Sequence, residues 1–338
     1  MKIISFFAGA GGLDLGFEKS GFQVIWANEY DKTIWDTYEH NHPNTYLDKR
    51  DLRKIPLNEI PDCIGIIGGP PCQSWSEAGA GRGINDSRGK LFNNYIEVIN
   101  HKNPLFFLAE NVSGILHLKH RQALNGIIDS FETAGHHGYN VSVQLLNASD
   151  FGVPQDRKRV FFVGYRKDLD TKFQFPKPLI TKKATLEKQI GDLVDGALPC
   201  EHGKTNVNLC TIPNHEYYVG SYSSIYMSRN RVRAWDEQSF TIQAGARHAP
   251  IHPQAPKMIF IEKNKRIFVP GKEELYRRLS VRECARIQTF TDDFIFVYNN
   301  IMDGYKMVGN AVPVDLAKAI ALKIYKDILN IIDIVCSA

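Results

Sequence analysis

Cys72 is the residue with the clearest chemical potential in this sequence. It follows the run Gly68-Gly69-Pro70-Pro71, and the two prolines stiffen the backbone before it. Gln73 and Ser76 come next, and their polar side chains argue against a core position for the thiol. A thiolate is a strong nucleophile, but free cysteine has a pKa of about 8.5, so a nearby positive charge or helix start is needed to lower it. The competing interpretation is an inert, buried thiol.

A glutamate and two arginines lie where they could assist such a nucleophile. Glu110 comes directly after the apolar run Leu105–Ala109, which would place its carboxylate at the same sheet edge as Cys72. Arg157 and Arg159 precede a further apolar run. In an extended segment these two side chains project to the same face, where they could bind a carboxylate or a phosphate. The alternative is an ordinary basic entrance to a strand.

A glycine-rich turn near the N-terminus predicts a ligand site. The first apolar run ends in Phe7-Ala8-Gly9-Ala10-Gly11-Gly12-Leu13-Asp14, and glycines at a strand-to-helix turn let a ligand approach the backbone closely. The GxGxxG pattern is incomplete, because Asp14 takes the place of the last glycine. Glu29, Tyr30 and Asp51 follow, and could bind ribose hydroxyls, stack on an adenine and accept from its amino group. Together they predict an adenosine site, and the lack of further pyrophosphate donors favours S-adenosylmethionine over a dinucleotide.

These residues lie between alternating strand-like and helix-like segments. Such alternation implies an α/β fold with a doubly wound, mostly parallel sheet, whose carboxyl edge would hold the candidate residues together. The expected strands are Lys2–Phe7, Gln23–Ala27, Asp62–Ile67, Leu105–Ala109, Val141–Asn147 and Val160–Tyr165. The expected helices are Leu13–Ser20, Asp31–Asn41, Arg88–Asn100 and Arg121–Ala134.

The pattern changes after Arg166. Residues 169–275 hold many Pro, Asn, Thr and Tyr residues in short β-like runs, which predicts a second, smaller domain, mostly of strands and loops. Residues 169–290 carry 19 Lys and Arg against 12 Asp and Glu, although the net charge of the whole chain is only +4. This suggests contact with a polyanion, and a solvated basic face is the alternative. Helical pattern returns at Ser280–Gln288, which begins with a capping-box signature, and at Val314–Ile332.

Composition excludes several classes of protein. With 338 residues and 43% hydrophobic side chains, the chain can bury a core and has room for two domains. The first apolar run breaks at Gly9, too soon for a signal peptide, and no stretch approaches the roughly 18 apolar residues of a membrane span, so we expect a cytoplasmic protein. The six cysteines form no CxxC pair and have no histidine at zinc-finger spacing. We therefore expect free thiols and no metal site.

Over nearly its whole length the sequence resembles the cytosine-5 DNA methyltransferase family. The resemblance covers the family's three cofactor motifs, its catalytic cysteine motif, its ENV and QxRxR motifs and its last two motifs. The matching segments are, in chain order, Phe7–Gly12, Glu29, Asp51, Pro71–Gln73, Glu110–Val112, Gln155–Arg159, Arg278–Arg286 and Gly309–Pro313. Arg50 departs from the glycine that many members have before the aspartate, and we expect no consequence.

The resemblance implies an S-adenosylmethionine-dependent methyltransferase fold and a mechanism. Cys72 would add to C6 of a cytosine flipped out of duplex DNA, while Glu110 hydrogen-bonds N3 and the exocyclic amine. Arg157 would hold the base and offset its charge. The other implied catalytic residues are Arg159, Gln73 and Ser76. The residues implied to hold the S-adenosylmethionine cofactor are Phe7, Gly9, Ala10, Gly11, Gly12, Leu13, Glu29, Tyr30, Asp51, Leu52, Pro70, Asn310 and Val312.

The resemblance also divides the chain. Residues 1–167 and 292–338 would form the cofactor and catalytic domain, and residues 168–291 the target-recognition domain. The segment from Gly220 to Arg247 is similar to that of the HaeIII-type branch, which modifies the inner cytosine of GGCC. The DNA-binding residues that this implies are Arg229, Arg231, Arg233, Arg247 and a wedge, Ile225. A restriction–modification role, a cognate endonuclease without a stable complex and a monomeric enzyme would follow.

Three other functions compete with this interpretation. A nicotinamide oxidoreductase would explain the glycine turn and Glu29, but not Cys72, Glu110 and a basic second domain together. An RNA cytosine-5 methyltransferase of the same fold is the nearer alternative, and the long arginine-bearing segment argues for DNA instead. A DNA-binding protein on an inactive methyltransferase scaffold would have no need of Cys72 and Glu110.

Overall fold

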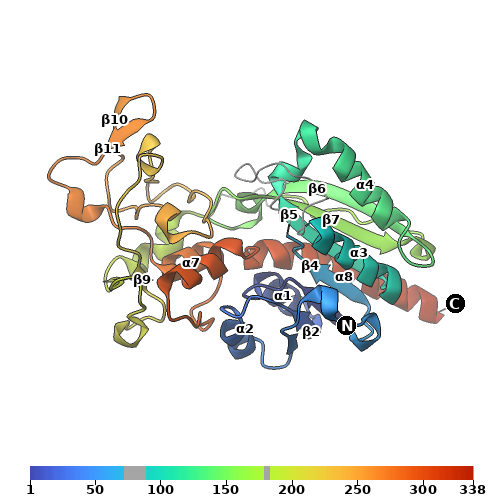
Figure 1. The fold of residues 1–338 in the computed structure, drawn as a ribbon. Coiled ribbons are helices and arrows are strands. Elements are labelled where there is room, and N and C mark those ends of the chain that lie inside the picture. The colour runs from blue at the N-terminus through green and yellow to red at the C-terminus, as the bar shows by residue number, and fades with distance from the viewer. Residues whose placement is uncertain (72–88, 179–182, 338) are drawn as a thin grey trace.

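The computed structural model describes residues 1–71, 89–178 and 183–337. Its centre is a sheet of seven strands in the order β3-β2-β1-β4-β5-β7-β6 (Figure 1). All neighbours are parallel except β7, which runs antiparallel to both β5 and β6. The strands are β1 (Lys2–Phe6), β2 (Gln23–Asn28), β3 (Tyr46–Asp48), β4 (Gly65–Gly68), β5 (Phe106–Val112), β6 (Tyr139–Asn147) and β7 (Lys158–Arg166). The expected α/β fold with a mostly parallel sheet is confirmed.

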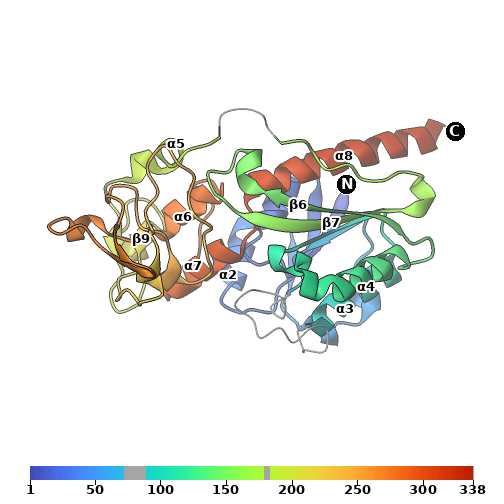
Figure 2. The ribbon, with the colours of Figure 1, turned by 90° about the horizontal axis from the view of Figure 1, so that it is seen from above.

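The sheet is covered by helices on both faces (Figure 2). On one face α1 (Gly12–Glu18) packs against the last helix, α8 (Val314–Ser337). Gly16 permits this close approach because it has no side chain. A Cβ at this position would lie 2.4 Å from the Cβ of Ala317. On the other face lie α3 (Gly89–Lys102) and α4 (Arg121–Glu132), whose apolar side chains share a core with Phe107 and Phe162. The end of the chain thus returns to α1, the helix that follows the first strand.

The order of the strands creates the place for a site. Strand β1 lies between β2 and β4, so the order of the strands reverses at β1. The connections that follow β1 and β4 therefore leave the sheet in different directions at this point. In open α/β sheets, ligands bind in the crevice that such a reversal leaves at the carboxyl ends of the strands. Glu29 follows β2, Gly69 follows β4, and Glu110 lies inside β5 rather than after it.

Three elements differ from the sequence-based expectation. Helix α2 (Trp35–Asn41) begins later than Asp31, because the carboxylates of Glu29 and Asp31 hold residues 31–33 in a turn. Strand β3 is only three residues long and has too little pattern to detect. Helix α7 (Ile301–Asn310) contains two glycines, which weaken the helical signal of its sequence.

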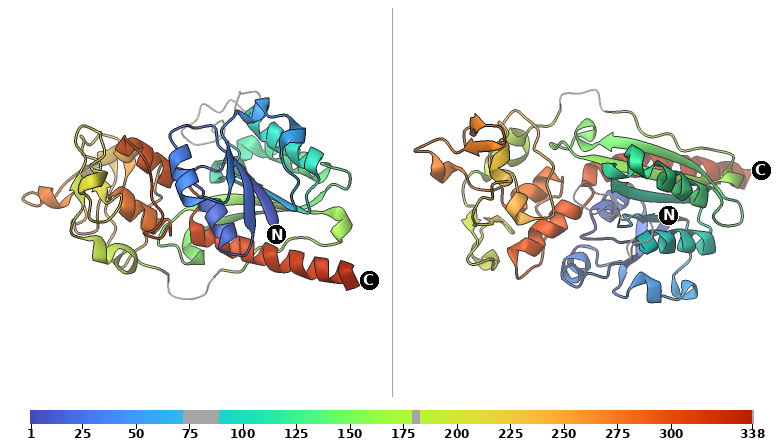
Figure 3. Two further views of the ribbon diagram at one scale, coloured as in Figure 1. Left: turned by 90° about the horizontal axis from the view of Figure 1, so that it is seen from below. Right: turned by 45° about the horizontal axis from the view of Figure 1, so that its top comes forward.

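The second part of the chain, beyond β7, lies past one end of the sheet (Figure 3). It is mostly loops and single turns. Its regular elements are α5 (Leu186–Ile190), β8 (Leu198–Pro199), β9 (Glu216–Tyr217), β10 (Ile259–Glu262), β11 (Lys265–Ile267) and α6 (Val281–Ile287). Helix α7 shares a hydrophobic core with α5 and α6, and that core also reaches Ala10 and Ile34 of the first part. The division into a cofactor unit (1–167 and 292–338) and a target unit (168–291) stays a prediction about how these parts work.

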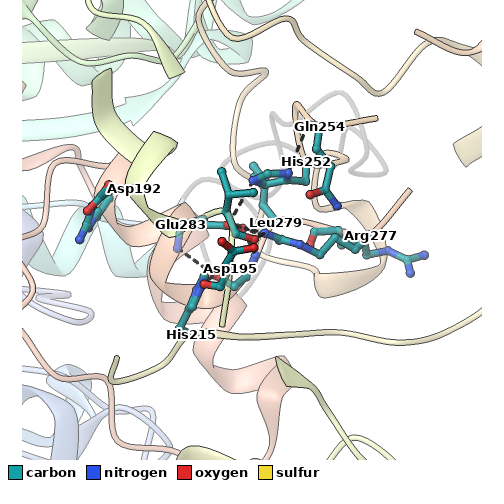
Figure 4. Close-up of polar contacts among 12 residues, drawn as sticks. Asp192, Asp195, His215, His252, Gln254, Arg277, Leu279 and Glu283 are labelled. Atoms are coloured by element: carbon teal, nitrogen blue, oxygen red, sulfur yellow. Dashed lines mark hydrogen bonds and ion pairs between the residues drawn. The ribbon is translucent and has the colours of Figure 1, made fainter. Parts of the chain in front are cut away.

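A buried ionic cluster organises this second part (Figure 4). Ser280 and Glu283 form the predicted capping box of α6, and the Glu283 carboxylate also accepts two hydrogen bonds from Arg277, at 2.8 and 2.7 Å. The His252 ring lies 3.4 Å from the same carboxylate, and His215 contacts Ser280 Oγ at 2.9 Å. Burial alone would raise the pKa of Glu283, but the hydrogen bonds and charge of Arg277 hold it below its usual value.

This cluster predicts a loss of stability in mild acid. Burial lowers the pKa of His252 to about 4, against the raising effect of Glu283. Below pH 6.5 His252 binds a proton in the unfolded chain but not in the folded protein, which favours unfolding. The stability that neutral His252 contributes is therefore complete above pH 6.5 and is lost as the pH falls towards 4. Between pH 7.5 and 5 the free energy of unfolding should fall by about 2 kcal/mol more in the parent than in His252→Gln. Urea unfolding at the two pH values measures this, and equal pH dependence in both proteins would contradict it.

Two features are absent from the described residues: a membrane-spanning helix and a group of metal ligands. Among the helices placed by the structure, none is long and apolar enough to cross a membrane. The same residues contain no group of three or more His, Cys, Asp or Glu side chains arranged to hold a metal ion.

Candidate active site

A cavity of about 450 Å³ lies at the carboxyl edge of the sheet. It is lined by residues from β1, β2, β5, the start of β7 and the end of α7. The predicted cofactor residues that line it are Phe7, Gly9, Ala10, Gly12, Leu13, Glu29, Tyr30, Asp51, Leu52, Pro70, Asn310 and Val312. Glu110 and Arg159 line the same cavity. Residues that lie far apart in the sequence therefore form one continuous site.

The glycine-rich turn shapes one wall of the cavity. Phe7, Gly9 and Gly11 all have positive φ, at 53°, 57° and 86°. For Phe7 this left-handed conformation is strained, and strain of this kind gathers at ligand sites. Gly11 does not line the cavity. Its role is steric, because a Cβ there would lie 2.1 Å from Nε2 of His42.

Glu29 fixes the turn and faces the cavity. Its carboxylate accepts the backbone N–H of Gly9 at 2.9 Å and that of Asp31 at 2.8 Å. Burial raises the pKa of Glu29, which these hydrogen bonds counteract. Each carboxylate oxygen keeps lone pairs for a further donor, so the group can still accept from a pair of hydroxyls.

Asp51 and Tyr30 lie near Glu29 on the cavity wall. Asp51 caps a single helical turn, Leu52–Lys54, and pairs with Arg53 at 2.5 Å. The hydrogen bonds from Arg53 lower the pKa of Asp51, so it is a carboxylate at neutral pH. Tyr30 is largely exposed, with its ring free to meet a planar ligand. Acceptors and an aromatic ring are what an adenosine group requires.

Glu110 and Arg159 form the other end of the cavity. The Nε of Arg159 lies 2.9 Å from Oε1 of Glu110. Burial raises the pKa of Glu110, and the positive charges of Arg159 and Arg157 oppose that rise. Next to Glu110 on β5, Asn111 donates to the carbonyl of Pro70 at 3.1 Å, which ties the segment before Cys72 to this strand. Cys72 itself, with Gln73 and Ser76, lies outside the described residues.

The sequence profile of C-5 cytosine-specific DNA methylases matches residues 1–326. The chain belongs to this family. It is 59% identical over 327 residues to Type II methyltransferase M.FnuDI of Fusobacterium nucleatum, covering 96% of this chain and 94% of that protein. It is 56% identical over 333 residues to Type II methyltransferase M.MthTI of Methanothermobacter thermautotrophicus, covering 98% and 99%.

A comparison of folds agrees. A solved E. coli structure, described as a DNA modification methyltransferase encoded within a prophage, superposes with a TM-score of 0.72 at 23% identity. The match covers 97% of this chain and 99% of that one. At this identity the likeness shows a common fold.

Arg157 of this methyltransferase lies elsewhere than the sequence suggested. We expected its guanidinium to hold the substrate base, but it is buried and does not line the cavity. It donates to the carbonyls of Ile242 at 2.9 Å, Gly309 at 2.8 Å and Ala311 at 2.9 Å. Arg157 thus joins the second part of the chain to the end of α7, and Arg159 is the arginine that faces the cavity.

Around Arg157 the backbone segments are packed without space. A Cβ on Gly309 would lie 2.3 Å from the carbonyl carbon of Gln243. Gln155 accepts from the N–H of Ile242 at 2.9 Å, and its amide donates to Gln288 at 2.8 Å. Gly309, which touches the backbone of residues 243–244, directly precedes Asn310 on the cavity wall. The cavity wall is therefore linked to this loop.

Removing this guanidinium should destabilise the whole enzyme. Arg157→Met removes three hydrogen bonds from a charged group to buried carbonyls, although the Ala311 carbonyl still accepts from Gln288 at 3.2 Å. Hydrogen bonds to a charged group contribute about 1.5–3 kcal/mol each, so we expect a loss of about 3 kcal/mol or more. Denaturant unfolding measures it. Lys158→Met, on the exposed neighbour, is the control and should change stability by about 0.5 kcal/mol at most. If Arg157→Met keeps the stability of the parent but loses catalysis, the expectation that Arg157 holds the substrate base would be supported instead.

The predicted DNA-reading side chains fall into two groups. Arg231 is only 7% exposed: its Nε donates to the carbonyl of Tyr226 at 2.8 Å, and a terminal nitrogen donates to that of Ile225 at 3.1 Å. It therefore supports the turn that presents Ile225, whose side chain is 71% exposed. Arg233 pairs with Asp156 and Glu237. Arg229 and Arg247 are exposed. A second cavity, of about 200 Å³, lies between these segments.

Sequence reasoning missed the roles of two charged residues, Asp14 on the cavity wall and Lys306 next to it. Asp14, taken for a broken glycine motif, is buried and accepts from Ser5 Oγ and Tyr38 Oη, both at 2.6 Å. Burial raises its pKa to about 6. Lys306 of α7 binds Asp31 Oδ2 at 2.9 Å and so fixes the turn after Glu29. A charged residue inside a glycine motif was the one available signal for Asp14.

Proposed function

We propose that this enzyme transfers a methyl group from S-adenosylmethionine to C5 of a cytosine flipped out of duplex DNA, through a covalent adduct between Cys72 and C6. The observation that carries the proposal is the single cavity with two chemically distinct ends. One end has Glu29 and Asp51 beside a glycine turn, and the other has Glu110 paired with Arg159. A methyl donor and its acceptor must meet in such a space.

The first end suits S-adenosylmethionine. Glu29 would accept from the two ribose hydroxyls, Asp51 from the adenine amine, and Tyr30 would lie against the adenine ring. The turn Gly9–Gly12 lets the ligand approach its backbone. When bound, the cofactor supplies an electrophilic methyl group. Asn310 and Val312 would close this end from α7.

The second end suits a cytosine. The thiolate of Cys72 adds to C6, forming a carbon–sulfur bond and making C5 enamine-like. Glu110 hydrogen-bonds N3 and the exocyclic amine as the ring takes up charge, with Arg159 orienting the carboxylate. After C5 has gained the methyl group, a base removes the C5 proton, and the electron pair reforms the 5,6 double bond as Cys72 leaves. Gln73 and Ser76 would assist beside Cys72.

This chemistry requires an extrahelical base. The reacting carbons of a stacked cytosine are out of reach of a cavity at a sheet edge, so the base must leave the duplex. Ile225, exposed on a turn held by Arg231, would enter the space that opens between base pairs.

For the target we propose the inner cytosine of GGCC, on the resemblance of residues 220–247 to the HaeIII-type segment. Arginine reads guanine through O6 and N7. Because Arg231 and Arg233 are engaged within the protein, Arg229 and Arg247 remain as the readers. The relatives named Type II methyltransferases support a role in restriction–modification. We also propose a cognate endonuclease that forms no stable complex, and a monomeric enzyme, which suits a reaction on one strand of a palindrome at a time.

The test is a map of 5-methylcytosine at base resolution. The protein is incubated with S-adenosylmethionine and plasmid DNA, and we expect methyl groups only on the inner cytosine of GGCC. Methylation within another sequence would keep the enzyme and reject the target. No DNA methylation by folded protein that binds the cofactor would make RNA the substrate to test next.

Two arginine variants separate reading from support. Arg229→Ala should weaken discrimination at one guanine by about 1–3 kcal/mol, because a bidentate contact is lost at that base alone. Arg231→Ala should weaken methylation of every sequence together, since the Ile225 turn loses its support. Relative kcat/KM on duplexes with one altered base pair measures both. A base-specific effect from Arg231→Ala alone would reverse the assignment.

A further inference from the structure

A two-stranded hairpin projects from the second part of the molecule (Figure 1). It consists of β10 (Ile259–Glu262) and β11 (Lys265–Ile267), paired antiparallel, with Phe260 opposite Arg266. All four residues of β10 are exposed.

The exposed side chains of the hairpin are of two kinds. Phe260 is 60% exposed, and Ile259, Ile261 and Ile267 are also exposed apolar side chains. Such a concentration of apolar surface on a few residues marks a contact surface. Lys263 and Lys265 are exposed beside it, and the Arg266 guanidinium lies 5.2 Å from the Phe260 ring centroid. The single acid, Glu262, is paired with Lys265 at 3.4 Å. The cations favour a polyanion as the occupant.

The base of the hairpin is fixed beside the proposed wedge. Strand β11 contacts the turn Tyr226–Ser228, which directly follows Ile225. Phe268, just after β11, packs edge-on against Tyr222 at 5.0 Å and stacks on Tyr276 at 4.1 Å. Tyr222 in turn donates to the carbonyl of Tyr276 at 2.6 Å. The hairpin is therefore packed against the turn, and DNA that meets Ile225 would pass close to β11.

We infer that the hairpin binds the sugar–phosphate backbone of duplex DNA outside the recognition sequence. Lys263 and Lys265 would contact phosphates, and an exposed apolar side chain of β10 would lie against the sugars. Phosphate contacts position a protein without reading sequence, so the enzyme would hold more DNA than it reads. This inference rests on the proposed function, because it assumes that the Ile225 turn faces DNA.

The experiment compares two duplexes that contain the same target. One ends about 4 base pairs beyond it, and the other extends about one helical turn further on each side. Each lost phosphate contact should reduce the slope of log Kd against log salt by about 0.9. The double variant Lys263→Ala/Lys265→Ala should therefore lose about 2 in slope on the long duplex and behave like the parent on the short one. The methylated sequence should stay the same.

A matched control and a second variant make the result decisive. Lys172→Ala/Lys326→Ala removes two exposed lysines, one on α8 and one beside Phe173, which shares a core with α8, and should leave both slopes unchanged. Helix α8 extends away from the hairpin (Figure 1). An unchanged slope in the hairpin variant on the long duplex, or an equal loss on the short one, overturns the inference. So does a change of sedimentation in Phe260→Ser with DNA binding intact, which would make the hairpin a protein interface. If the parent methylates no DNA, the proposed function fails instead.

Discussion

Replacing Cys72 with serine should abolish methyl transfer while duplex DNA still binds. Serine keeps the size of the side chain, but its hydroxyl is not ionised at neutral pH and is a poor nucleophile towards C6. Loss of a catalytic nucleophile typically costs several orders of magnitude, so we expect a fall of roughly 10⁴-fold or more in turnover. Transfer of labelled methyl groups into DNA measures the rate, and a gel-shift titration measures binding.

Cys63→Ser is the matched control for this change. Burial raises the pKa of Cys63 to about 12, so it is a neutral thiol and its replacement should leave turnover in place. A duplex with 5-fluorocytosine at the target gives an independent readout. Fluorine cannot leave C5 as a proton does, so the parent should stay covalently bound to the DNA and Cys72→Ser should not. Turnover near the parent level in Cys72→Ser would refute the covalent mechanism.

Replacing Glu110 with glutamine should lower turnover by about 10²–10⁴-fold, the range for a group that assists proton transfer. The amide of glutamine has the same shape as the carboxyl group, but it cannot bind and release a proton. Burial raises the pKa of Glu110, which favours proton binding by the native side chain. The substitution also leaves Arg159 without its ion-pair partner in the cavity. Turnover at saturating DNA and cofactor measures the chemical step, and cofactor affinity should change little because Glu29 and Asp51 are untouched.

Glu97→Gln, an exposed glutamate on α3, is the control for loss of one carboxylate. The fluorocytosine duplex again separates the explanations. If Glu110 assists the attack, Glu110→Gln should trap the DNA slowly, at a rate that falls with its turnover. Parent-like trapping with slow turnover would place Glu110 in a later step. Parent-like turnover would remove it from catalysis.

Much of the fold could be predicted from local pattern. The apolar runs that became β1, β4 and β5 are buried on both faces and read as strands without tertiary information. The glycine turn and the carboxylates after β2 and in β5 could be placed at one edge, because parallel strands end together. Helix α7 escaped detection, since its glycines serve packing against Gln243 and Tyr298 rather than helix formation.

Arg157 shows where such reasoning fails. The prediction that Arg157 and Arg159 share a face assumed an extended chain through both residues. Strand β7 begins at Lys158, so the alternation does not reach Arg157, and its side chain turns into the protein instead. The prediction that Arg231 reads a base fails for a similar reason. Its partners are carbonyls of its own turn, and no sequence pattern reveals which of several nearby arginines will be bound by them.

The close packing of Gly309 on Gln243 limits how such enzymes can be redesigned. Exchanging target segments between relatives is the obvious way to give this catalytic unit a new sequence preference. A graft that spans residues 168–291 would replace residues 242–244, whose backbone must keep its present path to accept from Arg157 and to fit against Gly309. Grafts should therefore keep residues 241–245 from the host. The region open to exchange is smaller than the whole recognition segment and consists of the arginine-bearing loops on either side.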